Sequence, residues 1–103
     1  MVQELTTQEL EQKLKNGEPL NLVDVREVDE WQAGHIKEAR NIPLSEIVQR
    51  VDEFPQEEME IVIICRSGGR SGKACDYLGA LGHTVINVSG GMLAWEGEVV
   101  TGD

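Results

Sequence analysis

Residues 61–71 read IVIICRSGGRS and decide the fold of this chain. Four consecutive β-branched residues, Ile61 to Ile64, precede a glycine-rich turn, which is typical of a fully buried strand in a parallel sheet. We expect a helix to open at Arg70 or Ser71, directly after that turn. An apolar strand, a tight turn and a helix in this order predict an α/β domain.

The flanking sequence continues this alternation of strands and helices. Further strands are expected over 20–25, 41–43 and 84–88. Helices are expected from the capping box Thr6-Thr7-Gln8-Glu9 to Gly17, over 27–32, from Ser45 onward, from Arg70 or Ser71 to a C-cap at Gly82, and over 92–95. Short loops between these elements predict a mainly parallel sheet with right-handed crossovers.

Apolar residues at helical spacing predict which helix faces are buried. They are Ile47, Val48, Val51 and Phe54 in the helix after Ser45, and Ala74, Tyr77, Leu78 and Leu81 in the helix after Arg70. In parallel sheets, ligands bind beyond the carboxyl ends of the strands, which is where Cys65 falls.

The composition sets the class of protein. A chain of 103 residues predicts one domain, residues 1–103. Its net charge of −10 argues against binding to nucleic acid or to an anionic membrane surface. No apolar run approaches the roughly 20 residues of a membrane-spanning helix, and the N-terminus does not resemble a signal peptide. Glu57, Glu58 and Glu60 are expected in a solvated turn.

Two cysteines exclude a disulfide scaffold and a four-cysteine zinc site, and we expect a reducing, cytosolic compartment. Of the two, Cys65 carries the chemistry. It lies where the buried strand ends, so its sulfur can face a cleft. Gly68 and Gly69 let the backbone curl until successive N–H groups point inward, and the following helix adds a partly positive N-terminus. These features predict a lowered pKa for the Cys65 thiol and a reactive thiolate.

Positive side chains gather around the same loop. Residues 65–75 hold Arg66, Arg70 and Lys73 and no acidic residue. This cationic island predicts a small anionic substrate, which arginine can bind through two hydrogen bonds.

Two simpler interpretations stay open at this point. Cysteine is among the most buried residue types, so Cys65 could be a core residue. The loop could also bind phosphate or sulfate without any reaction, although such a loop needs no cysteine.

Three motifs in order along the chain carry a family resemblance. The first comprises Leu22-Val23-Asp24-Val25-Arg26-Glu27, Glu30-Trp31, Gly34-His35-Ile36, Ala39 and Asn41-Ile42-Pro43; the second is Cys65 to Ser71; the third is Gly90-Gly91 with Ala94-Trp95. From about Leu22 to Trp95 the chain resembles a single-domain rhodanese, a thiosulfate sulfurtransferase. The resemblance implies a mainly parallel central sheet with helices on both faces.

The resemblance also implies a reaction. Cys65 would be the catalytic nucleophile, taking the outer sulfur of thiosulfate as a persulfide and passing it to cyanide or to a thiol such as thioredoxin or glutathione. The substrate and persulfide would be bound by Arg66, Ser67, Gly68, Gly69, Arg70 and Ser71. No organic cofactor and no metal are implied.

Two other functions are weighed against this one. Related phosphatases and arsenate reductases have an active-site loop one residue longer, whereas Cys65 to Arg70 spans six residues, which favours sulfur over phosphate. A cysteine-dependent phosphatase is therefore the less favoured enzyme. The other alternative is a sulfur-relay or regulatory module that carries persulfide but has little activity with thiosulfate.

Charged residues near the first motif have two interpretations. Arg26 could lie near the substrate, but we favour a structural ion pair between Asp24 and Arg26 that ties the strand end to neighbouring loops. Glu27 or Glu30 could also serve as a partner of Arg26.

The remaining aromatic, histidine and cysteine residues are expected to be structural. His35 is favoured as a donor or acceptor for backbone groups rather than as a general base, and His83 as an exposed residue. Cys75 could form a disulfide with an oxidised Cys65, but its place beside an apolar helix face favours packing. Trp31 and Trp95 are expected in the core or in a cleft wall.

Overall fold

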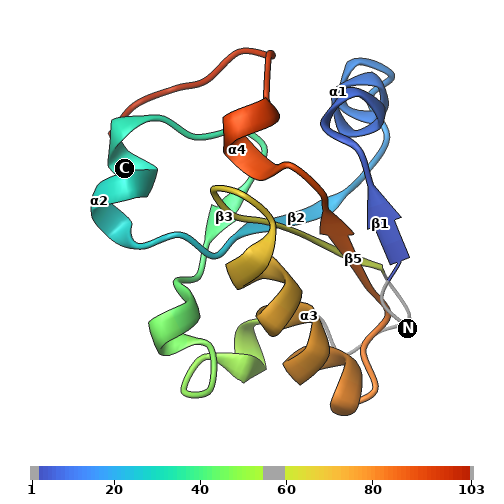
Figure 1. Cartoon of the computed structure of the whole chain (residues 1–103), viewed down its shortest axis with the longest axis vertical. Helices are drawn as coiled ribbons and strands as arrows, with labels where there is room; N and C mark the ends of the chain where they lie inside the picture. Colours follow the sequence, from blue (N-terminus) through green and yellow to red (C-terminus); the bar gives the residue numbers. More distant parts are fainter. Residues whose placement is uncertain (1–2, 55–59, 103) are drawn as a thin grey trace.

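One five-stranded sheet organises the molecule in this computed structural model, which describes residues 3–54 and 60–102 (Figure 1). The strand order is β1-β5-β4-β2-β3, and every pairing is parallel. The strands are β1 (Gln3–Leu5), β2 (Asn21–Asp24), β3 (Arg40–Asn41), β4 (Ile61–Ile64) and β5 (Val85–Val88). The predicted parallel α/β architecture is therefore confirmed.

Strand β4 lies at the centre of this sheet, between β2 and β5. All four of its side chains are buried, as the run of β-branched residues predicts. Its register pairs Ile63 with Val23 on one side and with Asn87 on the other. The carboxyl end of the most buried strand is thus where the chain delivers Cys65.

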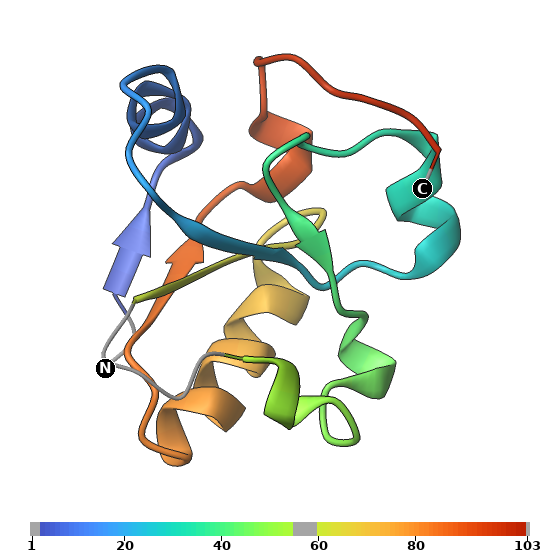
Figure 2. The ribbon, with the colours of Figure 1, turned by 180° about the vertical axis from the view of Figure 1, so that it is seen from behind.

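Helices cover both faces of the sheet (Figures 1 and 2). They are α1 (Thr7–Lys15), α2 (Val28–Ala33), α3 (Gly69–Ala80) and α4 (Gly91–Ala94), with two 3-10 turns, η1 (Leu44–Glu46) and η2 (Val51–Glu53). Because side chains alternate along a strand, β4 serves two cores. Ile61, Ile63 and Cys65 pack in the cluster of α3, while Val62 and Ile64 pack in the cluster of α1.

Local signals set the helix ends. The Thr6 hydroxyl accepts from the Glu9 amide at 3.1 Å, and the Glu9 carboxylate accepts from the Thr6 amide at 2.9 Å, which confirms the capping box of α1.

Near the C-terminal end of the chain, Val100 exchanges two backbone hydrogen bonds of 2.9 and 2.8 Å with His35. The C-terminal segment therefore returns beside α2 (Figure 1).

One element was missed and two expectations were wrong. Strand β1 was not predicted, because its three residues bury only Leu5 and show no usable alternation. The helix expected after Ser45 is instead the pair η1 and η2, and Val48 lies in the turn between them, where it is 60% exposed. Leu81 is 53% exposed rather than buried, because α3 ends at Ala80.

Other expectations fare differently. The C-cap of α3 is Leu81 rather than Gly82 as expected, because the helix ends at Ala80; Gly82 is the next residue and has a φ of 97°, which fits the left-handed residue that follows a helix end. Glu60 is exposed, while Glu57 and Glu58 lie outside the described residues. Within the part of the chain that the structure describes, no helix has the length and apolar character needed to cross a membrane.

Candidate active site

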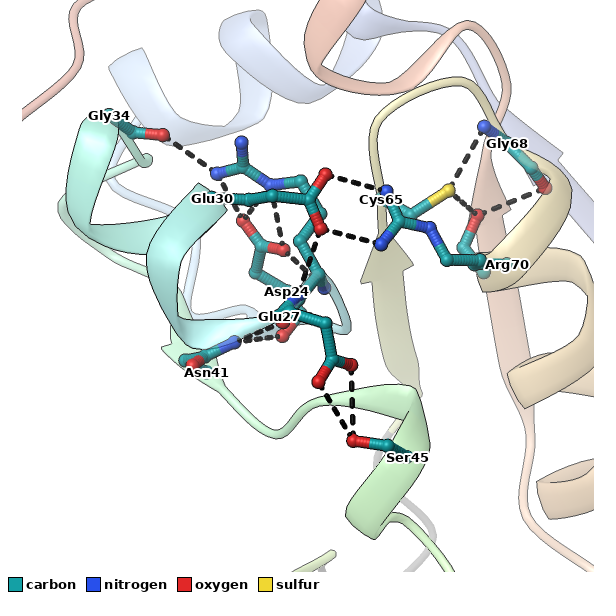
Figure 3. A network of polar contacts seen from close by, with 11 residues as sticks. Asp24, Glu27, Glu30, Gly34, Asn41, Ser45, Cys65, Gly68 and Arg70 are labelled. Carbon is teal, nitrogen blue, oxygen red and sulfur yellow. Dashed lines mark hydrogen bonds and ion pairs between the residues drawn. The ribbon is translucent and has the colours of Figure 1, made fainter.

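The candidate site is the loop between β4 and α3, with the Cys65 sulfur at its centre (Figure 3). Cys65 is fully buried and follows the last residue of β4. Gly68 is the N-cap of α3 and has a φ of 102°, in the left-handed region that favours glycine. This conformation directs the Gly68 amide onto the Cys65 Sγ at 3.1 Å.

The surroundings of the sulfur lower the pKa of Cys65. Burial opposes this change and is the largest single influence. The hydroxyl of Ser71 and the amides of Ser71, Gly68 and Ser67 together outweigh the effect of burial, because they stabilise a negative sulfur. The direction agrees with that expected from the sequence, and it favours a nucleophilic thiolate.

Helix α4 is hydrogen-bonded to the backbone of the loop. The amide of Met92 donates to the Cys65 carbonyl at 2.8 Å, and the amide of Leu93 donates to the Arg66 carbonyl at 2.9 Å. Gly91 makes this approach possible, because a Cβ there would lie 2.6 Å from the Arg66 oxygen. These two hydrogen bonds fix the backbone of the loop at Cys65 and Arg66. Gly90-Gly91 was part of the third motif, but this contact with the loop was not predicted from the sequence.

Arg70 is bound by Glu30 of α2. The two guanidinium nitrogens of Arg70 donate to the two carboxylate oxygens of Glu30 at 2.6 and 2.8 Å (Figure 3). These hydrogen bonds lower the pKa of Glu30 to about 2. Arg70 therefore stands beside the sulfur with its charge balanced by a carboxylate. Glu30 was expected, if anything, to partner Arg26, so its place in the site was missed.

Arg26 pairs with Asp24, as the structural interpretation predicted. Its Nε lies 3.1 Å from both carboxylate oxygens of Asp24, and another nitrogen lies 2.9 Å from one of them, in a buried contact. The guanidinium also donates to the Gly34 carbonyl at 2.7 Å. Glu27 instead accepts from the Ser45 hydroxyl at 2.9 Å (Figure 3). The pair thus joins the end of β2 to the segment after α2.

Arg66 and Lys73 complete the cationic island. Both are exposed. Among residues 3–54 and 60–102, neither forms an ion pair, in contrast to Arg70. The free positive charge of the loop is therefore smaller than the sequence suggests, and it is carried by these two side chains.

Ser71 contacts the sulfur from the first turn of α3. Its Oγ lies 3.3 Å from the Cys65 Sγ and 3.1 Å from the Gly68 carbonyl oxygen. It also hydrogen-bonds to Oδ1 of Asn87 in β5. Asn87 was not predicted as a site residue. A polar residue inside the apolar strand Val85–Val88 is the signal that could have identified it.

His35, Cys75 and His83 take no part in the site. The His35 ring bonds to the Trp31 carbonyl at 2.8 Å and stacks on the indole at 3.5 Å, as the structural interpretation predicted. Burial, with a smaller influence of Asp76, raises the pKa of Cys75 to about 12, so its thiol stays protonated and packs in the core. His83 is half-buried beside a ring of the core rather than exposed.

No metal centre adjoins this loop in the described part of the chain, where no three His, Cys, Asp or Glu side chains gather to hold an ion. The polar groups that face the sulfur are instead backbone amides, which donate hydrogen bonds, and the Ser71 hydroxyl, which can donate once the sulfur is a thiolate. Such a constellation can stabilise a sulfur anion and a covalent intermediate formed on it.

Comparison with known proteins points in the same direction. Residues 6–98 match the family model of the Rhodanese-like domain. A protein of Allochromatium vinosum named "Sulfurtransferase" is 41% identical over 96 residues, covering 92% of this chain and 89% of that protein. "Thiosulfate sulfurtransferase PspE" of Escherichia coli is 32% identical over 71 residues, which is 68% of each chain.

A solved structure agrees with the fold. A rhodanese-like domain protein from Staphylococcus aureus superposes with a TM-score of 0.90 at 36% identity, covering 99% of this chain and 100% of that one. The resemblance inferred from the three motifs and the expected architecture are therefore both confirmed.

Proposed function

This chain belongs to the rhodanese-like domain family, and we propose that it is a sulfurtransferase that carries sulfane sulfur as a persulfide on Cys65. One observation supports the proposal above all others: the Cys65 Sγ accepts a hydrogen bond from the Gly68 amide at 3.1 Å and lies 3.3 Å from the Ser71 hydroxyl. These groups favour a negative sulfur before the reaction, and the loop amides can also face the negative sulfur of a persulfide.

The first half-reaction is an attack by thiolate. The Cys65 sulfur displaces sulfite from the outer sulfur of thiosulfate: Cys65–S⁻ and S–SO3²⁻ give Cys65–S–S⁻ and SO3²⁻. One S–S bond breaks as another forms, and the bond electrons leave with sulfite. Because Cys65 is buried, we expect it to react with a donor whose outer sulfur is at the tip of the molecule and can enter the loop.

The second half-reaction regenerates the enzyme. Cyanide attacks the outer sulfur of the persulfide and leaves as thiocyanate, or a thiolate attacks and leaves as a new persulfide. Cys65 departs as a thiolate, stabilised by the same donors that activated it. Thioredoxin or glutathione would supply such a thiol in a reducing compartment, and we propose the cytosol as that compartment.

The size of the loop separates this proposal from phosphate chemistry. Six residues run from Cys65 to Arg70, one fewer than in the related phosphatases. In addition, Glu30 accepts from both terminal nitrogens of Arg70 and balances its charge, which weakens the attraction of Arg70 for a phosphate group. Phosphatase activity is therefore disfavoured by both the length and the electrostatics of the loop.

A second candidate, a sulfur-relay module, is favoured by the same ion pair. With Arg70 balanced by Glu30, the loop offers less net charge to the thiosulfate dianion than to a donor with a single negative charge. An alkyl or protein persulfide is such a donor. The relay differs from the first candidate only in the donor it accepts.

The deciding experiment measures the mass of the intact protein after incubation with thiosulfate, 3-mercaptopyruvate or glutathione persulfide. A gain of about 32 Da, one sulfur atom, is expected on Cys65. Gain from thiosulfate supports the first candidate, and gain from the persulfide alone supports the relay. No gain from any donor, or turnover of an aryl phosphate, would overturn the proposal.

Two variants control that measurement. Cys65→Ser should lose the added mass, because a hydroxyl is a poor nucleophile at neutral pH. Cys75→Ala removes the other cysteine, whose thiol is buried and protonated, and should keep the added mass. If Cys75→Ala alone lost the adduct, Cys65 would not be the carrier.

A further inference from the structure

Asn87 of strand β5 contacts the active-site loop. It lies in β5, is 7% exposed, and pairs in register with Ile63 of β4. Since Ile63 and Cys65 face α3, the paired Asn87 side chain faces α3 as well. Its amide thereby reaches two atoms of the loop, the Ser71 Oγ and the Gly68 carbonyl oxygen.

The orientation of this amide is set by its two partners. The Asn87 Nδ2 donates to the Gly68 carbonyl oxygen at 3.3 Å, and a carbonyl can only accept. The opposite atom, Oδ1, must then face the Ser71 Oγ. Asn87 therefore offers Ser71 an acceptor and no donor.

Ser71 has one hydroxyl proton and more than one acceptor for it. While Cys65 is a thiol, its S–H donates to the Ser71 Oγ across 3.3 Å, and the Ser71 proton is free for Asn87. Once Cys65 is a thiolate, the sulfur can only accept. Ser71 must then turn its proton to the sulfur, which leaves its Oγ and the Asn87 Oδ1 facing each other without a proton between them.

We propose that Asn87 is a positioning residue that competes with Cys65 for the hydroxyl proton of Ser71. Its carbonyl takes the proton while the Cys65 sulfur carries no charge, and yields the proton when the thiolate forms. The Gly68 carbonyl, 3.1 Å from the Ser71 Oγ, is a weaker competitor because it already accepts from the Gly72 amide at 3.0 Å.

This competition makes the Ser71 hydroxyl point its proton in two different directions during the sulfur-transfer cycle. This part of the inference rests on the proposed function. In the persulfide the charge lies on the outer sulfur, so the Ser71 proton returns to Asn87. When an acceptor removes the outer sulfur, charge develops on the Cys65 Sγ, and Ser71 turns back to stabilise it. Asn87 thus sets how readily Cys65 ionises and how well it leaves.

Removing the Asn87 carbonyl should change the ionisation of Cys65 in the direction opposite to that of ordinary structural damage. Removing a buried hydrogen-bonding residue normally loosens its surroundings, and loosening the donors around Cys65 would disfavour its thiolate. Removing the Asn87 carbonyl instead takes away a competitor, so the thiolate should form more readily. Replacing Ser71 removes the donor itself and should have the opposite effect.

The test is the pH dependence of alkylation of the intact protein by iodoacetamide, read by mass. With Asn87→Leu, which has nearly the same shape, we expect alkylation of Cys65 about three- to tenfold faster at pH values below the wild-type midpoint. Ser71→Ala should be slower there. The limiting rate at high pH reports access to the sulfur, so a steric change is distinguished from a change in ionisation.

The double variant Ser71→Ala/Asn87→Leu separates competition from structural damage. If Asn87 acts through Ser71, its replacement changes nothing once the hydroxyl is gone. Arg70 and Cys75 of α3, which interact electrostatically with Cys65, stay constant in all of these variants. So do Glu30 of α2 and Glu27 at its N-cap, which interact with Arg70, and Arg66 of the loop.

Slower alkylation in Asn87→Leu, or an acceleration that persists without Ser71, would overturn the inference. Asn87→Val, which suits a strand, replaces the leucine variant if that variant does not fold, with the same expected result. Alkylation needs no sulfur donor. Failure here therefore leaves the persulfide mass test untouched, and failure of that test leaves this one interpretable.

Discussion

Arg70 and Glu30 face each other across the active-site loop in two parallel hydrogen bonds of 2.6 and 2.8 Å, although 40 positions separate them in the chain. The pair joins α3 to α2. Such a fork is a strong arrangement for arginine and carboxylate. It also balances the charge of Arg70, so we expect Glu30 to influence which donor the loop prefers.

Glu30→Gln should improve the use of thiosulfate. Glutamine keeps the size of the side chain but removes the charge that balances Arg70, so a dianionic donor gains attraction. We expect KM for thiosulfate to fall about two- to fivefold, with a smaller change for a persulfide donor of single charge. Steady-state kinetics with both donors measure this, and the difference should shrink at high salt.

Arg70→Ala is the matched control for that change. It removes the guanidinium and should raise KM for thiosulfate, and Glu30→Gln should have no further benefit in its presence. If Glu30→Gln left the ratio of the two donors unchanged, the carboxylate would have no part in selecting the donor.

The same pair makes stability depend on pH. The pKa of Glu30 is about 2 in the folded chain against an ordinary value of 4.5. A lowered pKa stabilises the fold fully above the ordinary value, and that contribution is lost as pH falls from about 4.5 towards about 2. After allowance for partial exposure we expect about 1 kcal/mol. Urea unfolding of wild type and Glu30→Gln at pH 7 and pH 3 measures it.

In that comparison, the wild type should be the more stable protein at pH 7, and its advantage should narrow at pH 3. A difference between the two proteins that stayed constant over this range would mean that the ion pair does not contribute. Arg50, the N-cap of η2, and Glu53 form an ion pair at the surface, and Glu53→Gln provides a control.

Arg66→Ala should weaken capture of thiosulfate. Arg66 is exposed and, among the described residues, forms no ion pair, so it is the loop arginine whose charge is free for a donor. We expect KM for thiosulfate to rise several-fold, which corresponds to a loss of about 1 kcal/mol of binding free energy, with little change in kcat. Lys73→Ala, which removes an exposed cation further along α3, should change KM less.

If Arg66→Ala and Lys73→Ala had equal effects, general attraction by the island would account for them rather than contact with Arg66. If neither changed KM, the cationic island would have no role in binding. Raising the salt concentration distinguishes these cases, because it weakens long-range attraction more than a direct hydrogen-bonded contact.

Local patterns allowed the centre of the site to be predicted. The buried strand Ile61–Ile64, the glycines that follow and the helix after them lie within one short stretch. Together they place Cys65 at the end of a parallel strand and turn amides towards it. These features depend on residues that are neighbours in the sequence, so they can be predicted without knowledge of the tertiary structure.

The partners of that stretch could not be predicted in the same way. Glu30 bonds to Arg70 across 40 positions and Asn87 to Ser71 across 16, and only the packing of α2 and β5 brings them together. The charge pattern of residues 65–75 therefore predicted more free positive charge than the folded loop presents. The exposure of Val48 has a local cause instead, since this residue lies in the turn between the two 3-10 helices that replace the expected helix.

Gly91→Ala should inactivate the protein by moving the loop. Gly91 has a φ of 56°, and an added Cβ would lie 2.6 Å from the Arg66 carbonyl oxygen, which accepts from Leu93. Relief of this overlap must push the loop away from α4 and disturb the amides that face Cys65. We expect a loss of about 2 kcal/mol or more in stability and slower alkylation of Cys65.

Gly82→Ala is the matched control, because Gly82 also has a positive φ, 97°, but a Cβ there meets nothing within 4 Å. It should show the backbone strain alone, about 1 kcal/mol, with the alkylation profile of Cys65 unchanged. Equal behaviour of the two variants would mean that strain, and not contact between α4 and the loop, explains the effect at Gly91. A difference confined to Gly91→Ala would show that the close approach of α4 keeps the loop amides on the sulfur.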